Sequence, residues 1–201
     1  MPSKKVKHAR QTQLSNSGLT SANSNNLEKC ERFSKSNRRQ VAHKIETSLT
    51  GAAGEHLVLS RLLSRGFLAA QAPRGTRKAD ILVNFLDGGE PFLIQVKARQ
   101  YGSDGGWHMG EKHEEQIEED LVFCFVDFEP EYPTVHVIPA KIVAETIKQD
   151  HQIWLDTPGK NGKPHNPTTF RRLKPNSNGK ELGWMDEYLE NWNQLERSRQ
   201  K

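Results

Sequence analysis

Hydrophobic residues change their spacing along the chain, and the change predicts a helix followed by short strands. Between residues 49 and 66 apolar side chains recur every three or four positions, which is typical of a helix with one buried face. The predicted buried stripe is Ala52, Leu59, Leu62 and Leu63. Apolar runs at 67–72, 80–85 and 92–99 predict three strands, and the Gly and Pro residues between the last two indicate a β-hairpin.

The second half of the chain continues this alternation of elements. Residues 121–128 are almost continuously apolar, as in a strand covered on both faces, and residues 134–138 alternate between apolar and polar. Pro139 suits the first turn of a helix that is predicted to reach about Trp154. Apolar residues at helical spacing predict a closing amphipathic helix at 185–195. The pattern as a whole predicts an α/β fold.

The two ends of the chain lack this patterning. Residues 1–48 are rich in Ser, Asn, Lys and Arg, which is typical of a disordered segment. They carry ten Lys or Arg against three Asp or Glu, a net charge of +7, so the remainder carries −3. We predict a basic arm at 1–48, a folded domain at 49–195 and a polar tail at 196–201. The arm either touches phosphates without sequence specificity or is a solvated leader.

Composition narrows the setting in which the protein acts. The two cysteines, Cys30 and Cys124, are too few for a disulfide framework, and a reducing cytoplasm fits them. No stretch has the pattern of a signal peptide, and no apolar run approaches the roughly 18 residues of a membrane span. We therefore expect neither secretion nor membrane insertion.

A cluster of polar side chains interrupts the apolar patterns. Glu55 lies one step back along the helical stripe, on or beside the buried face, where an unpaired charge is unfavourable. Alternation places Asp80 at the start of the first hairpin strand, and Gln95 and Lys97 together on one face of the second. If the strands match faces, these three side chains converge near one edge of the sheet, and the helix can bring Glu55 to them. An ordinary salt-bridged surface cluster is the alternative.

This set of side chains suits the hydrolysis of phosphodiesters. Two carboxylates and nearby carbonyl oxygens are the hard ligands that Mg²⁺ prefers, and the ion keeps waters for attack. Such an ion polarises a phosphoryl oxygen and lowers the pKa of a bound water. Lys97 would stabilise the extra negative charge of the transition state or orient the attacking water.

The same residues carry a family resemblance. Gly54-Glu55, then Ala79-Asp80-Ile81, then Ile94-Gln95-Val96-Lys97 together resemble the PD-(D/E)xK nuclease superfamily, in the variant where glutamine replaces the second acidic residue. The Gln-x-Lys form is similar to Mrr-type restriction endonucleases, and the Gly-x-x-Gly-Glu opening is similar to archaeal Holliday-junction resolvases. The resemblance covers roughly residues 49–139.

This resemblance implies a restriction-endonuclease-like αβββαβ core, with a central mixed sheet flanked by helices. It implies Mg²⁺- or Mn²⁺-dependent cleavage of DNA, in restriction and defence or in repair and recombination. At the matching positions, Asp80, Glu55 and the backbone carbonyl of Val96 would hold the metal, and Gln95 would orient the site or offer its amide carbonyl. Double-strand cleavage by an enzyme of this size implies a homodimer.

Basic residues flank the cluster on both sides in the sequence. Arg74, Arg77 and Lys78 run directly into Asp80, and Arg99 follows Lys97 on the same strand face. We predict that they contact the DNA backbone, which fixes register without reading sequence. The alternative for the loop is a solvated turn with incidental charge.

Two departures from the superfamily pattern keep a second function open. Ala79 stands where proline is usual, which leaves the chemistry intact. Gln95 removes a negative charge, so metal binds more weakly unless another acid compensates. The runner-up is a nucleic-acid-binding module of the same fold that no longer cleaves. A protein that recruits partners through its arm is a third possibility.

A glycine-rich stretch at 101–110 predicts a mobile loop beside the cluster. Trp107 within it suits a hydrophobic gap better than stacking on a base. His108 and His113 suggest zinc, but their spacing fits no regular helix face and no cysteine pair accompanies them. We therefore expect no zinc site there.

Overall fold

The computed structural model describes residues 46–86, 88, 91–100 and 105–195, and every structural statement below concerns these residues. The chain divides into two units, Met1–Lys44 and Ile45–Lys201. The predicted arm therefore lies outside the described residues except for its last three positions, and the predicted tail lies outside them entirely. Both stay predictions.

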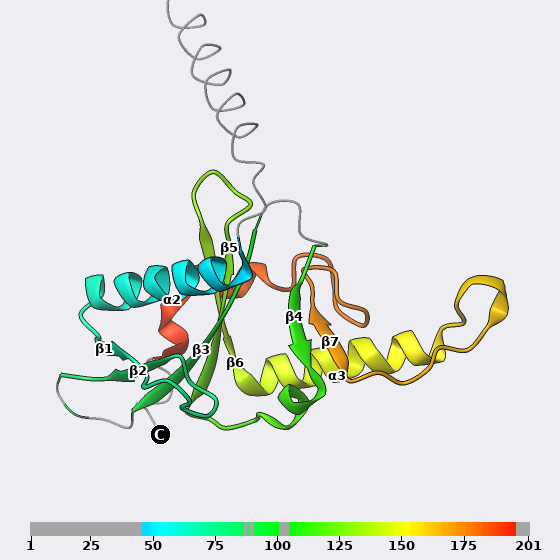
Figure 1. The fold of residues 1–201 in the computed structure, drawn as a ribbon, viewed down its shortest axis with the longest axis horizontal. Helices are drawn as coiled ribbons and strands as arrows, with labels where there is room; N and C mark the ends of the chain where they lie inside the picture. The colour runs from blue at the N-terminus through cyan, green and yellow to red at the C-terminus, as the bar shows by residue number, and fades with distance from the viewer. Residues whose placement is uncertain (1–45, 87, 89–90, 101–104, 196–201) are drawn as a thin grey trace, which may run out of the picture. The chain divides into compact units, whose positions relative to one another are not determined.

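The described residues form α-helices, β-strands and short 3₁₀ turns (Figure 1). The α-helices are α2 (Thr47–Ser64) and α3 (Ala140–Asp156). The strands are β1 (Leu68–Gln71), β2 (Ile81–Asn84), β3 (Phe92–Arg99), β4 (Trp107–Gly110), β5 (Leu121–Asp127), β6 (Thr134–Pro139) and β7 (Phe170–Leu173). The 3₁₀ turns are η1 (Glu111–Glu115), η2 (Lys160–Gly162), η3 (Asp186–Tyr188) and η4 (Trp192–Leu195).

A mixed five-stranded sheet forms the centre of the folded unit, with strand order β1-β2-β3-β5-β6. The β2–β3 pair is the predicted hairpin, with Ile81 opposite Ile94, and β3 runs parallel to β5. A parallel pair needs a crossover connection. In the described residues this crossover contains β4 and η1, and α3 comes only after β6. The fold is therefore α/β with a central mixed sheet, as the sequence predicts.

Two hydrophobic cores cover the faces of this sheet. The first lies between α2 and one face, and it includes Val58, Leu62, Ile94 and Val96. The second lies on the opposite face, under α3, β4 and β7, and it includes Phe123 and Phe125 (Figure 1). All seven residues of β5 are buried, which confirms the prediction of a strand covered on both sides.

The buried face of α2 differs from the predicted stripe. The residues that α2 buries are Thr50, Gly54, Val58 and Leu62, which recur every four positions. Leu63 is instead half exposed. A Cβ added at Gly54 would lie only 2.7 Å from the Cβ of Ala98, so glycine is required for this close approach of α2 to β3. Glu55, the next residue, is thereby held close to the sheet.

A second, two-stranded sheet is formed by β4 and β7. The prediction of a mobile loop at 101–110 is wrong for Trp107–Gly110. Each strand has only four residues, and the partners, such as Met109 and Arg171, lie far apart in the chain. Trp107 is buried and donates its indole N–H to the Val126 carbonyl at 2.9 Å, which confirms its predicted place in a hydrophobic gap.

The predicted closing helix at 185–195 is also wrong. The segment forms η3 and η4, and between them Glu190 has φ 50°, which no α-helix contains. Glu190 accepts hydrogen bonds from Arg61 at 3.0 Å and from the backbone N–H of Val135 at 3.0 Å. These contacts with α2 and β6 replace the regular helical bonds. Within the described residues, no helix combines the length and the apolar surface that crossing a membrane requires.

Candidate active site

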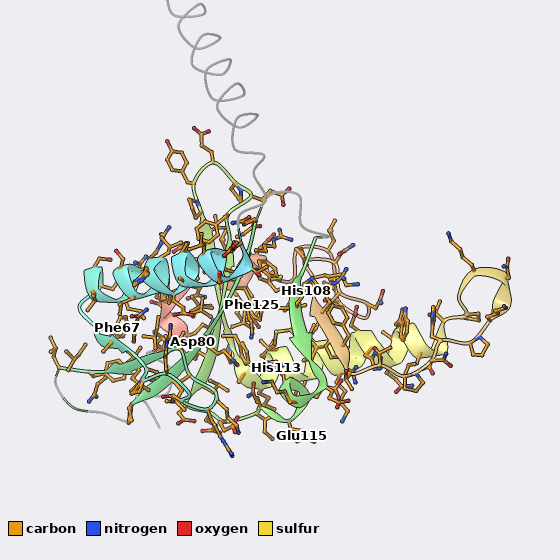
Figure 2. All side chains as sticks on the ribbon, viewed as in Figure 1. Phe67, Asp80, His108, His113, Glu115 and Phe125 are labelled. Carbon is orange, nitrogen blue, oxygen red and sulfur yellow. The ribbon has the colours of Figure 1, made fainter. Side chains whose placement is uncertain are left out.

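Asp80 occupies the position where β2 separates from β3. Its backbone N–H donates to the Ile94 carbonyl at 2.8 Å, and its carboxylate Oδ2 accepts from the backbone N–H of Val96 at 2.7 Å. The carboxylate thus accepts the hydrogen bond that the backbone of a longer β2 would accept from Val96. The strand β3 continues past this point to Arg99. Figure 2 shows Asp80 beside β3 and below α2 in this view.

The backbone of Val96 points to the same edge of the sheet. In an antiparallel pair, a residue that directs its N–H toward the partner strand also directs its C=O there. Since the Val96 N–H meets the Asp80 carboxylate, the Val96 carbonyl faces the opening beyond β2. This opening therefore carries a carboxylate and a backbone carbonyl oxygen.

Gln95 and Lys97 flank Val96 and lie on the sheet face opposite α2. Gln95 is in register with Phe123 and Lys97 with Phe125, and both phenylalanines belong to the second core. Both side chains are half-buried. The side-chain carbonyl Oε1 of Gln95 is buried, and no donor contacts it among the described residues. This oxygen is turned into the protein, away from solvent.

Glu55 approaches Asp80 from the other face of the sheet. The pKa of Glu55 lies above its ordinary value of 4.5, first because partial burial disfavours the ionised form and second because of repulsion from the Asp80 carboxylate. The helix packs on the Val96 face, and Asp80, in the plane between the two faces, is the residue common to both.

Lys97 is kept close to Asp80 without an ion pair. Burial lowers the pKa of Lys97, the nearby Lys112 acts in the same direction, and Asp80 opposes both. Among the described residues, no ion pair or hydrogen bond of the Lys97 ammonium is present. An ammonium with three donors and no partner is poised to bind an anion.

The donor set around Asp80 fits a hard divalent cation. No group of three or more His, Cys, Asp or Glu side chains within the described residues is arranged to hold a metal ion. Glu55, Asp80 and the Val96 carbonyl supply only two carboxylates and one neutral oxygen. The mutual repulsion of the two carboxylates is what a cation between them would relieve. Mg²⁺ commonly binds through one or two carboxylates and retains waters, so this small set is sufficient.

The basic residues predicted to contact DNA have three different environments. Arg74 and Arg77 are exposed, and no ion pair within the described residues engages them. Lys78 has φ 65° and forms an ion pair with Glu118. Arg99 is a structural residue, because its guanidinium lies 2.5 Å from Asp127 and 4.4 Å from the centre of the Trp107 ring.

Sequence reasoning missed His113, which lies beside the site. It is 3% exposed, and its ring is 6.0 Å from that of Phe123, the residue in register with Gln95. Burial lowers the pKa of His113, the backbone of Gly110 opposes this, and Lys97 and Lys112 lower the pKa further. The surrounding Lys112-His113-Glu114-Glu115 looks like a solvated charged turn in the sequence, so no local signal indicates its burial. His108 lies elsewhere, on the exposed face of β4.

Comparisons with known proteins give a likeness of fold. No family model and no curated protein matches the chain. Among solved structures, the chain is similar to the bacterial homing endonuclease I-Ssp6803I, with 15% identity and a TM-score of 0.45 over 76% of this chain and 94% of the endonuclease. At that identity and TM-score the likeness assigns neither an activity nor site residues to this chain.

Proposed function

We propose that this protein is a Mg²⁺- or Mn²⁺-dependent DNA endonuclease of the PD-(D/E)xK type. The observation that carries the proposal is the position of Asp80: its carboxylate caps β2, bonds to Val96 between Gln95 and Lys97, and interacts electrostatically with Glu55 and Lys97. A surface salt-bridge cluster would pair these charges directly. Here they are close and unpaired among the described residues, an arrangement that a cation and an anionic substrate would stabilise.

In this proposal each residue has one role. Asp80, Glu55 and the Val96 carbonyl hold the metal ion. When bound, the ion supplies Lewis-acid activation of the scissile phosphate and of an attacking water. Lys97 donates to the phosphate oxygens, on which negative charge increases in the transition state. Because Asp80 is held by the Val96 N–H, its free oxygen is directed before the substrate arrives.

The elements that carry these residues correspond to the first part of an αβββαβ core. We assign α2, β1, β2 and β3 to the opening αβββ segment and β5 to the strand that pairs parallel with β3. The segment with β4 and η1 replaces the usual crossover helix in this assignment. Arg74 and Arg77, exposed on the loop before Asp80, contact the DNA backbone. Arg99 is left out of this surface because Asp127 and Trp107 engage it.

A second candidate function is supported by Gln95. A neutral amide at this position weakens metal binding, and the buried Oε1 does not face the opening. A nucleic-acid-binding module that has lost cleavage would tolerate this change. It would not need Lys97 to remain half-buried, because burial disfavours the lysine charge and the Asp80 carboxylate offsets this only in part.

Nicking of supercoiled plasmid by the purified full chain separates the two functions. The nuclease proposal predicts nicking that requires Mg²⁺ or Mn²⁺ and disappears in Asp80→Asn, where the amide oxygen can still accept from Val96. Asp127→Asn is the matched control, because it changes a carboxylate that is bonded to Arg99. DNA binding without nicking in either metal would support the binding module. Linear product formed in one encounter would indicate a homodimer.

A further inference from the structure

We infer that His113 is a positioning residue of the candidate site, which fixes the direction of the Gln95 amide through one buried water. The inference rests on the proposed nuclease function and names a residue outside the PD-(D/E)xK motif. It follows from three buried polar atoms that have no partner in the described part of the chain.

His113 lies close to Gln95 in the fold. η1 lies against α3 and beside β4, and its residue His113, labelled in Figure 2, is on the sheet face that also bears Gln95 and Lys97. The His113 ring lies 6.0 Å from that of Phe123, and Phe123 is the β5 neighbour of Gln95. Gln95 and His113 therefore border the same buried region.

The two ring nitrogens of His113 have different environments. Nδ1 of His113 lies 2.9 Å from the backbone nitrogen of Gly110 and 2.9 Å from the Gly110 carbonyl. We assign Nδ1 as the acceptor of the Gly110 N–H, which leaves the proton on Nε2. Nε2 is buried and has no partner among the described residues.

Two amide oxygens complement the Nε2–H donor of His113. The side-chain oxygens Oε1 of Gln95 and of Gln116 are also buried without partners in the described residues. Gln116 follows His113 by three positions, and its backbone N–H donates to the His113 carbonyl at 3.4 Å. One water accepts one hydrogen bond from Nε2–H and donates one to each amide oxygen, so it satisfies all three atoms. Buried waters typically make about three such bonds.

The consequence for the site is a fixed amide direction. With Oε1 held toward the water, the NH₂ group of Gln95 points away from the core, toward the opening that Asp80 and Lys97 border. Gln95 then offers hydrogen-bond donors to a substrate phosphate, where a carboxylate would have offered a metal ligand. The glutamine is in this way a second donor beside Lys97.

The histidine tautomer is the direct test, and it does not depend on cleavage. In ¹⁵N-labelled full chain, the ring signals of His113 are assigned by their loss in His113→Gln. We expect a proton on Nε2 and none on Nδ1. We also expect the Gln95 side-chain amide signals to shift in His113→Phe, which keeps the ring contact with Phe123, and to stay in place in His108→Phe. A proton on Nδ1, or Gln95 side-chain amide signals that do not shift in His113→Phe, would overturn the inference.

Kinetics distinguish positioning from packing. His113→Phe should lower kcat by about tenfold and leave KM for DNA unchanged, whereas His113→Gln, which retains a donor, should stay within about twofold of the wild type. In a Gln95→Met background, His113→Phe should have no further effect, since it acts through Gln95. Additive effects would contradict the inference. If the wild type cleaves no DNA, the nuclease proposal fails, while the tautomer and the Gln95 signals still decide this one.

Discussion

Lys97 and Arg99 lie two residues apart on the same face of β3, yet Arg99 forms an ion pair and Lys97 forms none with the described residues. Arg99 lies 2.5 Å from Asp127, 3.7 Å from Glu129 and 4.4 Å from the Trp107 ring centre. Asp127 also accepts the backbone N–H of Glu129 at 2.9 Å. This is a buried ion pair with a second carboxylate and an aromatic ring beside it, although the Arg99 Nε–H is buried and has no acceptor among the described residues. A fold accommodates charge in this way when the charge serves structure.

At Lys97 the fold accommodates charge differently. The ammonium and the Asp80 carboxylate interact electrostatically without bonding, and Glu55 lies near enough to Asp80 to repel it. The repulsion between Glu55 and Asp80 and the burial of the Lys97 ammonium are unfavourable, and the attraction between Lys97 and Asp80 offsets them only in part. The comparison shows that burial of charge alone does not mark a site, because the Arg99 side chain is only 10% exposed and its charge is paired. What distinguishes the site is charge that the described part of the protein leaves unpaired.

The most damaging change on the Lys97 side should be Asp80→Asn. We expect kcat for plasmid nicking to fall by about 10³-fold, because the metal loses its central ligand. The unfolding free energy should hardly change, since the amide oxygen still accepts from Val96. Steady-state nicking assays and urea denaturation measure the two quantities. A large loss of stability would show that Asp80 belongs with Asp127 as a structural acid.

Arg99→Met tests the other side of the comparison. Removing the guanidinium leaves Asp127 buried without its cation, which should lower the unfolding free energy by about 3 kcal/mol. Cleavage per folded molecule should stay close to that of the wild type. Urea denaturation gives the first value, and active-site titration with nicking gives the second. A loss of kcat without a loss of stability would show that Arg99 acts in the candidate site.

Gln95→Glu restores a negative charge at this position and tests its effect on the Mg²⁺ requirement. A carboxylate here adds a hard ligand, so the Mg²⁺ concentration at half-maximal rate should fall on the order of tenfold. Gln194→Glu is the matched control, because it adds the same charge to another buried glutamine, in the turn η4, which carries none of the proposed site residues. An unchanged metal requirement in Gln95→Glu would mean that residue 95 does not face the metal in either form.

Glu55→Gln should reveal the repulsion between the two carboxylates as a pH dependence. Because the pKa of Glu55 is raised, the folded protein binds a proton more tightly than the unfolded chain, and stability is lost as the pH rises from 4.5 through the folded pKa. The neutral variant avoids this loss. Its Tm should equal that of the wild type at pH 4 and exceed it by about one degree at pH 7, a small effect because Glu55 is partly solvated. Saturating Mg²⁺ should remove the difference.

The smallest expected effect is at the basic loop. Arg77→Ala should raise KM for DNA a few-fold and lower the slope of log affinity against log salt by about one, as for one lost phosphate contact. Lys78→Ala should do less, because Glu118 already engages the Lys78 ammonium. Fluorescence anisotropy at several salt concentrations measures both variants. Equal slopes for the two would contradict the distinction between paired and unpaired cations.

The sequence predicts the part of the fold that depends on local patterns. The β2–β3 hairpin, its alternating faces and the doubly buried β5 follow from the spacing of apolar residues. The helix α2 ends at Ser64, close to the predicted end at residue 66, where Gly66 has φ 85°. These features are decided by neighbours in the chain, and that is why the pattern is sufficient.

Long-range contacts decide what the sequence could not predict. The β4–β7 sheet joins short segments that carry no strong strand signal. The end of the chain has helical spacing, but Glu190 bonds to Arg61 and Val135 and breaks the helix. At the site, the proximity of Asp80 and Lys97 could be predicted because both lie on one hairpin. The burial of His113 could not, because it depends on the packing of η1 against α3.

Binding of Mn²⁺ to the metal-free protein, followed by electron paramagnetic resonance, tests the central claim most directly. If the charges around Asp80 are unpaired because they hold a cation, the wild type and Asp127→Asn bind one Mn²⁺ per chain, and Asp80→Asn does not. Equal binding by Asp80→Asn and the wild type would contradict the account, because the metal would then be held by other residues.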